Sequence, residues 1–379
     1  MTQRVDGVDH ALATSVDNIH CMLHVNLGPR SYDISVVSAN LTSFGSFARD
    51  RSSAKRGLII ADDNVMKHAE PIAHALHSVG IEPTLTSVSP GEASKALAVA
   101  ARLYDVLASL PADRKTPVIA VGGGVVGDLA GFVAATYNRG LPFFQVPTTL
   151  LAMVDSSVGG KVGINISAGK NLVGAFHQPA GVWIDTATLA TLPDREYRSG
   201  LAEVVKYGVI LDADFFAWLE DAVDAILLRT AASVGHIVRR SCELKTGVVE
   251  QDEREETGLR AMLNYGHTFA HAFEAVGGYG TWLHGEAVAA GMVCASRLAE
   301  KLGRVGPEVT TRQIRLLERF GLPTVPLPEW DASAIVEAMR RDKKSVAGSL
   351  RLVLPTRIGH VEAGVEVDEG LVRSVVTEF

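Results

Sequence analysis

The sequence predicts a two-part protein, an α/β domain with a parallel sheet followed by a mainly α-helical domain. Up to about residue 185, short runs of Val, Ile and Leu alternate with amphipathic stretches, which is the pattern of βαβ units. From about residue 194, long segments with apolar residues at helical spacing replace them. The length of 379 residues, 47% of them hydrophobic, suits two domains. We expect an N-terminal extension over 1–20, an α/β domain over 21–190 and a helical domain over 191–379.

The parallel sheet is predicted from short apolar segments in the first half of the chain. Residues 57–61 (GLIIA) and 117–121 (PVIAV) are predicted to be buried strands, with a further strand near Pro83–Val88. Amphipathic helical stretches lie between them, so consecutive strands should run parallel.

The helical domain is predicted from apolar residues that recur at helical spacing. Strand signals are nearly absent there until RLVLP at 351–355. The predicted helices cover residues 196–210, 212–228, 231–250, 260–276, 284–302 and 309–320.

Composition excludes several classes of protein. The net charge of -7 and the lack of a basic tract argue against a nucleic-acid partner, but not against a small anionic substrate. No segment approaches the ~18 uninterrupted apolar residues of a membrane-spanning helix, and residues 1–20 lack the apolar core of a signal peptide. Cys21, Cys242 and Cys294 are widely separated, as expected of free thiols in a reducing compartment, so we expect a cytoplasmic protein.

A glycine-rich turn follows the predicted strand PVIAV. Gly122, Gly124 and Gly127 have the spacing of a dinucleotide-binding turn, and a helix (LAGFVAATY) follows. The turn comes late in the domain, however, and the usual acidic residue about 20 positions onward is missing. We therefore expect a Rossmann-like but not an ordinary phosphate site, with a packing turn as the alternative. Asp62 and Asn64 end a strand and can supply ribose contacts.

Four residues in the helical half are candidate metal ligands. Glu203 lies in LAEVVKYG, His267 and His271 in NYGHTFAHAFE, and His284 in LHGEAVAAGM. His267 and His271 are four residues apart, so spacing alone nominates them as a ligand pair on one helix face. One carboxylate and two imidazoles would leave a zinc ion with positions open for substrate. The alternative is a set of capping or core histidines.

Several cations lie among glycines and apolar residues rather than in charge runs. If their side chains converge, they form a site for phosphate and carboxylate groups; otherwise they are solvated surface charges. The set comprises Lys161, Lys170, Lys206, Lys245 and Arg260, with Asn171 and Asn264 beside them.

These motifs together resemble the dehydroquinate synthase family of sugar-phosphate cyclases. The resemblance runs from about residue 55 to beyond 355 and is carried, in order, by GGGVVGDLAGFVAATYNRG, QVPTTLLAMVDSSVGGKVGINISAGKNLVGAFHQP, LAEVVKYG, LNYGHTFAHAFE, HGEAVAAGM and RRDKK. It implies a homodimer in which NAD lies between the Rossmann-like domain and a helical metal-binding domain. It also implies a zinc site at Glu203, His267 and His284, where cobalt can replace zinc. His271 becomes a contact of the substrate phosphate, which overrides the pair nominated by spacing.

The resemblance also implies the remaining site residues. The NAD contacts would be Asp62, Asn64, Glu92, Lys95, Gly123, Gly124, Val125, Asp128, Thr148, Thr149 and Lys170. Substrate would meet Lys161, Asn171, Lys206, Lys245, Arg260, Asn264, His271 and either Lys343 or Lys344. Asp155 would lie near the nicotinamide and the substrate hydroxyls, and Arg139 would reach the phosphate from the neighbouring subunit.

The implied activity is that of a carbon–oxygen lyase of the shikimate pathway, which makes 3-dehydroquinate and phosphate from 3-deoxy-D-arabino-heptulosonate 7-phosphate. NAD would oxidise a ring alcohol, phosphate would leave, the ketone would be reduced again, and an aldol closure would form the carbocycle, with zinc as Lewis acid. Three alternatives stay open: a sibling cyclase acting on a sedoheptulose or glucose phosphate, a metal-dependent polyol dehydrogenase, and a non-catalytic nucleotide sensor. Arg260, Lys245 and Asn264 favour a substrate with a carboxylate, and the intact metal set argues against a sensor.

Overall fold

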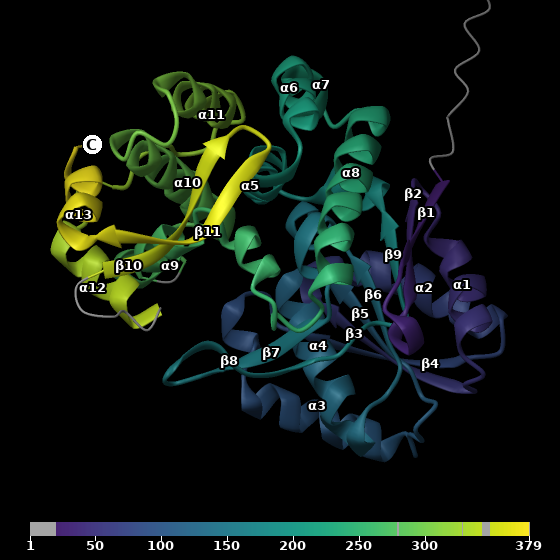
Figure 1. Cartoon of the computed structure of the whole chain (residues 1–379). Helices are drawn as coiled ribbons and strands as arrows, with labels where there is room; N and C mark the ends of the chain where they lie inside the picture. The colour runs from purple at the N-terminus through teal and green to yellow at the C-terminus, as the bar shows by residue number, and fades with distance from the viewer. Residues whose placement is uncertain (1–19, 279, 328, 343–348, 379) are drawn as a thin grey trace, which may run out of the picture.

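The computed structural model describes residues 20–278, 280–327, 329–342 and 349–378. Its first part is a seven-stranded sheet in the order β1-β2-β9-β6-β5-β3-β4 (Figure 1). The strands are β1 (His20–Val25), β2 (Tyr32–Val37), β3 (Arg56–Asp62), β4 (Glu82–Val88), β5 (Val118–Gly122), β6 (Phe143–Pro147) and β9 (Gly181–Asp185). All neighbours are parallel except β1 and β2, so the predicted parallel sheet is confirmed with one antiparallel edge.

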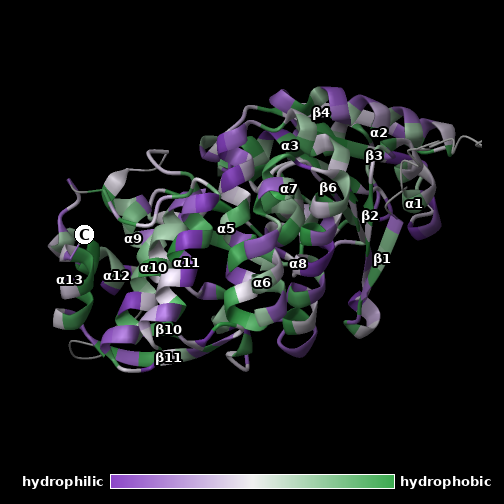
Figure 2. Ribbon diagram, turned by 90° about the horizontal axis from the view of Figure 1, so that it is seen from above, coloured by the Kyte–Doolittle hydropathy of each residue, from purple (hydrophilic) through white to green (hydrophobic). Residues whose placement is uncertain are grey.

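Both faces of this sheet are covered by helices, because its central strands are apolar on both sides. In β3, Leu58 and Ile60 pack in one cluster with α3 (Leu97–Ser109) and α4 (Gly124–Thr136). Ile59 and Ala61 point the other way, into a cluster with α1 (Phe44–Arg51) and α2 (Met66–Ser78). Figure 2 shows hydrophobic residues along these strands and hydrophilic ones on the outer helices.

A two-stranded hairpin that the sequence analysis did not separate from the sheet extends from the α/β domain. It consists of β7 (Lys161–Ile166) and β8 (Gly169–Phe176), which pair antiparallel beside α4. Figure 1 shows it projecting past the sheet toward the helical domain. Leu172 and Phe176 of β8 are exposed.

The second part is mainly helical, as predicted. Its helices are α5 (Asp194–Leu211), α6 (Ala213–Asp221), α7 (Val223–Leu227), α8 (Ala231–Gln251), α9 (His267–Gly277), α10 (His284–Lys301), α11 (Pro307–Arg319), α12 (Ala332–Asp342) and α13 (Glu369–Thr377). The predicted strand at 351–355 lies within β10 (Ser349–Arg357), which pairs with β11 (His360–Asp368). None of the described helices is long and apolar enough to cross a membrane.

Two predicted helices differ from the structure. The segment 212–228 is divided into α6 and α7 at Ala222. The segment 260–276 begins as a 3-10 turn, Leu259–Asn264, and α9 starts only at His267. The break has a physical cause, since Gly266 takes a left-handed conformation (φ 79°). A Cβ at Gly266 would also lie 2.8 Å from the backbone nitrogen of Met292, so α10 packs directly against this turn.

The two parts share a hydrophobic core. Tyr32 and Ile34 of β2 belong to the same buried cluster as Leu201 and Val205 of α5 and Val238 of α8. Strand β9 ends at Asp185 and α5 begins at Asp194, so the boundary expected near residue 190 lies between these two elements. The domain limits themselves stay a prediction, and the proposed extension falls almost entirely outside the described residues.

Candidate active site

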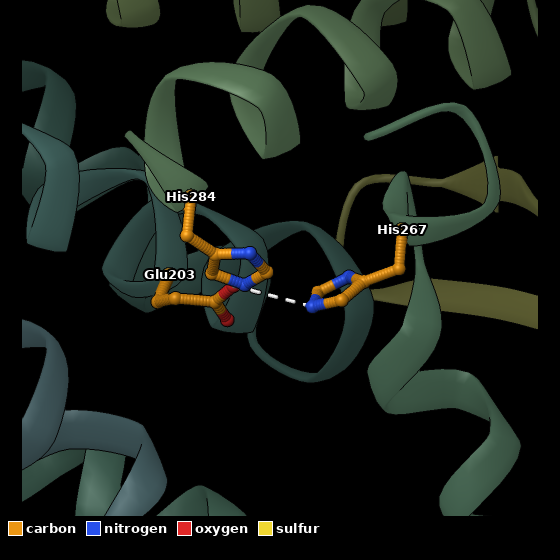
Figure 3. A group of neighbouring side chains, drawn as sticks. All are labelled: Glu203, His267 and His284. Atoms are coloured by element: carbon orange, nitrogen blue, oxygen red, sulfur yellow. Dashed lines mark ion pairs between the residues drawn. The ribbon is translucent and has the colours of Figure 1, made fainter. Parts of the chain in front are cut away.

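Three helices bring a possible metal-binding group together. Glu203 comes from the middle of α5, whereas His267 and His284 are the first residues of α9 and α10. One ligand atom from each lies within 4.8 Å of the others, and Figure 3 shows the three side chains pointing toward one another. The Nε2 atoms of His267 and His284 are 3.5 and 3.7 Å from Oε1 of Glu203.

Local structure orients both imidazoles. Nδ1 of His267 lies 3.1 Å from the carbonyl oxygen of Tyr265, so the ring can donate there and present Nε2 to Glu203. His284 is the first residue of α10. This end of the helix is fixed to α5, because the backbone nitrogen of Gly285 donates to Oγ of Ser199 on α5 (3.0 Å). Helix α10 is therefore fixed against α5, and α9 packs against α10.

The charges of this group fit a divalent metal. Both oxygens of Glu203 are buried and receive no well-directed hydrogen bond from the described residues, although Lys206 lies in ion-pair contact. Burial would raise the pKa of Glu203, but the charges of Lys206 and His267 lower it to about 2. Burial and the charge of Lys206 lower the pKa of His267 to about 3, so its imidazole is neutral and can act as a ligand. An ionised carboxylate beside a neutral imidazole offers the oxygen and nitrogen donors that zinc binds.

Glu274 is a residue of this site that the sequence analysis missed. Its Oε2 lies 3.8 Å from Nδ1 of His284, and its Oε1 lies 3.4 Å from Nζ of Lys170 on β8. Burial opposes the charge of His284, but Glu203 and Glu274 raise its pKa to about 10. A metal ion at this group would therefore compete with a proton for His284. The signal was present in the sequence, because Glu274 follows His267 by two helical turns and lies on the same face.

The histidine pair nominated by spacing alone is not the group that the structure assembles. His271 lies one turn after His267, with ring centroids 5.8 Å apart, but the third member of the group is His284. Helical spacing places two residues on one face, yet it carries no information about which other helix faces them. The structure thus brings together the set implied by the family resemblance.

The candidate nucleotide residues lie at the carboxyl ends of neighbouring strands. Asp62 ends β3 and its Oδ1 accepts from the backbone nitrogen of Asn64 (2.8 Å). Gly123 and Gly124 join β5 to α4, and Val125 belongs to the first turn of that helix. Thr148 and Thr149 follow β6. These ends share one edge of the parallel sheet, where ligands of open α/β sheets bind.

Three more nucleotide candidates form a charged cluster beside that edge. Nζ of Lys95 lies 2.5 Å from Oδ2 of Asp128 on α4 and 3.7 Å from Oε1 of Glu92. Asn165 on β7 donates to Glu92 (2.8 Å), which ties the cluster to the β7–β8 hairpin. Lys170 lies on that hairpin, where its partner Glu274 belongs to the helical domain.

Each candidate substrate cation faces a carboxylate. Lys206 pairs with Glu203, Lys161 is in contact with Glu255, and Nε of Arg260 lies 3.6 Å from the same Glu255. Arg260 is buried and also donates to the carbonyl oxygen of Glu253 (2.7 Å). Glu255 itself adopts a positive φ of 62°, a strained conformation that is more frequent at functional sites.

Lys245 and Asp155 link the nucleotide edge to the metal group. Nζ of Lys245 donates to Oδ1 of Asp155 (2.8 Å) and to its backbone oxygen (2.6 Å). The hydroxyl of Tyr207, a second residue missed from the sequence, donates to the same Oδ1 (2.6 Å). Gly124 of the glycine turn lies beside this cluster, since a Cβ there would be 3.0 Å from Oγ of Ser156. Tyr207 follows Glu203 by one helical turn, so the two sites are continuous.

The remaining candidates are outside this cluster or outside the described residues. Asn171 lies exposed on β8, and Asn264 ends the 3-10 turn before α9. Arg139 is exposed, has a positive φ of 67°, and has no ion-pair partner among the described residues. Lys343 and Lys344 fall within 343–348, which the structure does not describe.

Solved structures of high similarity identify the class of protein. One is a 2-deoxy-scyllo-inosose synthase complexed with carbaglucose-6-phosphate, NAD+ and Co2+, with a TM-score of 0.87 and 26% identity over 94% of this chain and 100% of that chain. Another is 2-epi-5-epi-valiolone synthase from Streptomyces hygroscopicus subsp. jinggangensis 5008 with NAD+ and Zn2+ bound, with a TM-score of 0.83 and 28% identity over 92% of this chain and 96% of that chain. The fold and the three-residue group define the chain as a protein of the sugar-phosphate cyclase type.

Sequence comparison identifies the family within that class. The family models for the C-terminal and N-terminal parts of 3-dehydroquinate synthase match residues 200–345 and 85–199. The 3-dehydroquinate synthase of Desulforamulus reducens (strain ATCC BAA-1160 / DSM 100696 / MI-1) is 48% identical over 357 residues, covering 94% of this chain and 99% of that protein. The chain belongs to the 3-dehydroquinate synthase family.

Proposed function

We propose that the chain converts 3-deoxy-D-arabino-heptulosonate 7-phosphate into 3-dehydroquinate and phosphate, with NAD and a divalent metal as cofactors. The observation that carries this proposal is the continuity of the site. The group Glu203, His267 and His284 is joined through Tyr207 and Asp155 to the glycine turn and to a set of cations. Nearly full-length identity of 48% to a 3-dehydroquinate synthase supports the same reaction.

The cofactors divide the chemistry between them. Glu203, His267 and His284 would hold zinc or cobalt, and the sheet edge from Asp62 to Thr149 would hold NAD. When bound, the metal supplies Lewis acidity to neighbouring hydroxyls and NAD accepts and returns a hydride. Lys206 places a positive charge against Glu203 from within α5, which keeps this carboxylate ionised in a buried position.

The cations would bind the two anionic ends of the substrate. Arg260 offers a planar guanidinium suited to a carboxylate, and its position is fixed by burial and by the carbonyl of Glu253. Lys161 is half exposed and pairs with Glu255, so an incoming phosphate or carboxylate can replace that partner. Holding both ends orients the reacting carbons, which lowers the entropic part of the barrier at each step.

We infer further that the protein acts as a cytoplasmic homodimer in which Arg139 completes the phosphate site of the partner subunit. Asn138 and Arg139 both adopt positive φ values, 50° and 67°, at the exposed end of a 3-10 turn. Such strain in two consecutive non-glycine residues is more frequent at functional sites. The exposed side chains Leu172 and Phe176 of β8 are apolar, as expected of residues that a second subunit covers.

A sibling cyclase activity is the second candidate, because the solved structures of high similarity act in that class. The sugar phosphates of the sibling cyclases carry no carboxylate, so they need no carboxylate partner such as Arg260 or Lys245. The presence of both cations therefore favours the heptulosonate phosphate.

The test is a substrate panel. The purified protein with zinc and NAD is given the heptulosonate phosphate, sedoheptulose 7-phosphate or glucose 6-phosphate, and released phosphate, carbocyclic product and NADH are followed. We expect phosphate and 3-dehydroquinate from the heptulosonate phosphate alone, without net NADH. Turnover of sedoheptulose 7-phosphate or glucose 6-phosphate would establish the sibling activity. Steady accumulation of NADH would establish a dehydrogenase.

A further inference from the structure

Asp155 lies on an unusual backbone element. Residues Ala152–Ser156 form a single π-helical turn between β6 and β7. This conformation is rare in proteins as a whole, but many of its examples lie at functional sites. Two residues of α8 hold this turn through its carbonyl groups. Sγ of Cys242 lies 3.3 Å from the carbonyl oxygen of Met153, and Nζ of Lys245 donates to that of Asp155 (2.6 Å). The backbone that carries Asp155 is therefore fixed from the helical domain.

The side chain of Asp155 is fixed as well, through one of its two oxygens. Oδ1 accepts from the hydroxyl of Tyr207 (2.6 Å) and from Nζ of Lys245 (2.8 Å). A hydroxyl donating to a carboxylate at this distance forms a short, charge-assisted hydrogen bond. Tyr207 is fully buried in α5, and burial together with the charge of Asp155 raises its pKa well above the usual range, so it stays a donor.

The two donors leave the other oxygen available. No described residue donates a hydrogen bond to Oδ2 of Asp155, while a quarter of this side chain remains exposed to solvent. Burial would raise the pKa of Asp155, but the charges of Lys245 and Lys206 and the bonds from Lys245 and Tyr207 hold it well below its usual range. Asp155 is thus an ionised acceptor with one oxygen anchored and the other free.

We propose that Tyr207 is a positioning residue, which anchors Oδ1 of Asp155 so that Oδ2 receives a hydroxyl group of the substrate beside the metal group. Tyr207 follows Lys206 directly and Glu203 by one helical turn, so α5 sets the position of the metal carboxylate and of Asp155 together. The proposal rests on the proposed function, since it assigns a hydroxyl-bearing substrate to this site. The hydroxyl of Tyr207 is carried by a rigid helix, so it restricts the conformations of the Asp155 side chain before substrate binds.

The chain contains a matched control for this role. Tyr197 lies on the same helix, is also buried, and donates its hydroxyl to the carbonyl oxygen of Ile226 (2.8 Å). Tyr197→Phe and Tyr207→Phe each remove one buried hydroxyl from α5. Only Tyr207→Phe removes a donor from Asp155, so any difference between the two variants reports on positioning rather than on loss of a core hydrogen bond.

Steady-state kinetics of the metal- and NAD-loaded enzyme test the proposal. We expect Tyr207→Phe to lower kcat about 10-fold, the effect of one lost hydrogen bond to a charged group, with KM within about twofold of wild type. Tyr197→Phe should leave both constants unchanged, while both variants keep similar thermal stability. The proposal is wrong if the two variants behave alike, or if Tyr207→Phe raises KM and leaves kcat unchanged.

A second measurement separates this proposal from the proposed function. Amide hydrogen exchange over residues 150–158 reports on the π-helical turn without substrate. Tyr207→Phe should raise the exchange rate there severalfold relative to Tyr197→Phe, because Asp155, a residue of the turn, loses one of the two donors that hold its side chain. If the wild type fails to turn over the heptulosonate phosphate, the proposed function falls while this exchange result still tests the anchor. Equal exchange in both variants would overturn the anchoring role.

Discussion

The metal-binding group and the proposed substrate cations Lys161 and Arg260 are organised in different ways. Glu203, His267 and His284 all come from helices of one core, and the carboxylate is completely buried. Lys161 and Arg260 instead come from different parts of the chain and share the partner Glu255, which is more than a third exposed. Packing determines the geometry of the metal group before any ligand binds, whereas the cations form ion pairs that an anionic substrate can exchange.

The largest expected effect concerns the preformed metal group. His284→Ala should remove zinc binding and lower turnover by roughly 1,000-fold or more, because several kcal/mol of charge stabilisation are lost. Metal content by mass spectrometry and turnover with saturating zinc measure this. His74→Ala on the exposed side of α2 is the control. A folded His284→Ala variant with full zinc content and activity would show that the metal lies elsewhere.

A smaller effect is expected from Glu274, which contacts the candidate metal ligand His284. Glu274→Gln should weaken zinc binding about 10- to 100-fold, since the carboxylate that faces Nδ1 of His284 no longer orients the ring. Competition with a fluorescent chelator measures the dissociation constant. Glu220→Gln, which removes a carboxylate paired with Arg312 in the same domain, is the control. Unchanged affinity in Glu274→Gln would mean that packing alone orients His284.

For the ion pairs of Glu255 we expect a substitution to increase the affinity for phosphate rather than to decrease it. Glu255→Gln should remove the carboxylate that Lys161 and Arg260 share and tighten binding of inorganic phosphate by up to about fivefold, the range of an exposed ion pair such as Lys161–Glu255. Calorimetric titration at low and high salt measures this, and the gain should shrink at high salt. The exposed neighbour Glu256→Gln is the control. Weaker phosphate binding in Glu255→Gln would show that Glu255 orients these cations instead of competing for them.

The smallest effect concerns the segment that carries Glu255. Asp252 accepts from the backbone nitrogens of Glu256, Thr257 and Arg260 (2.9, 3.0 and 3.1 Å). Burial would raise its pKa, but these bonds lower it from 3.8 to about 2. Its stabilising effect is therefore complete above about pH 4 and is lost as the pH falls toward 2.

Denaturant titrations measure this pH dependence. Asp252→Asn should lower the unfolding midpoint by a constant amount from pH 7 to pH 5, and the difference from wild type should shrink below about pH 4. Surface Asp50→Asn is the control. A difference that grows on acidification would contradict the assignment of these bonds to an ionised Asp252.

Much of the fold followed from local patterns. Strands β3, β4 and β5 and helices α5, α8, α10 and α11 are where the local pattern of apolar residues placed them. Two of the features that were not predicted show the limit of local patterns. The break before α9 depends on the contact between Gly266 and Met292 of another helix, and the antiparallel edge strand β1 depends on a shared core with the second domain. Both are long-range contacts, which a local pattern does not contain.

The candidate site shows the same limit. Periodicity found that His267 and His271 share a face, but only the family resemblance selected His284 over His271 as the second imidazole ligand, and the structure brings His284 within reach of Glu203. Glu274 could have been found from its spacing after His267. Tyr207 could not, because tyrosines in apolar helices are usually core residues and its partner Asp155 lies about fifty positions away in the sequence.

The side chains that β2 contributes to the helical core have a consequence for the independence of the two halves. Tyr32 and Ile34 are covered by residues of α5 and α8, so a fragment that ends near residue 190 would leave them exposed to water. A fragment that begins there would lack part of its own interior. The halves matched by separate family models are therefore expected to melt together in one cooperative transition, and neither should be recovered as a stable product of limited proteolysis.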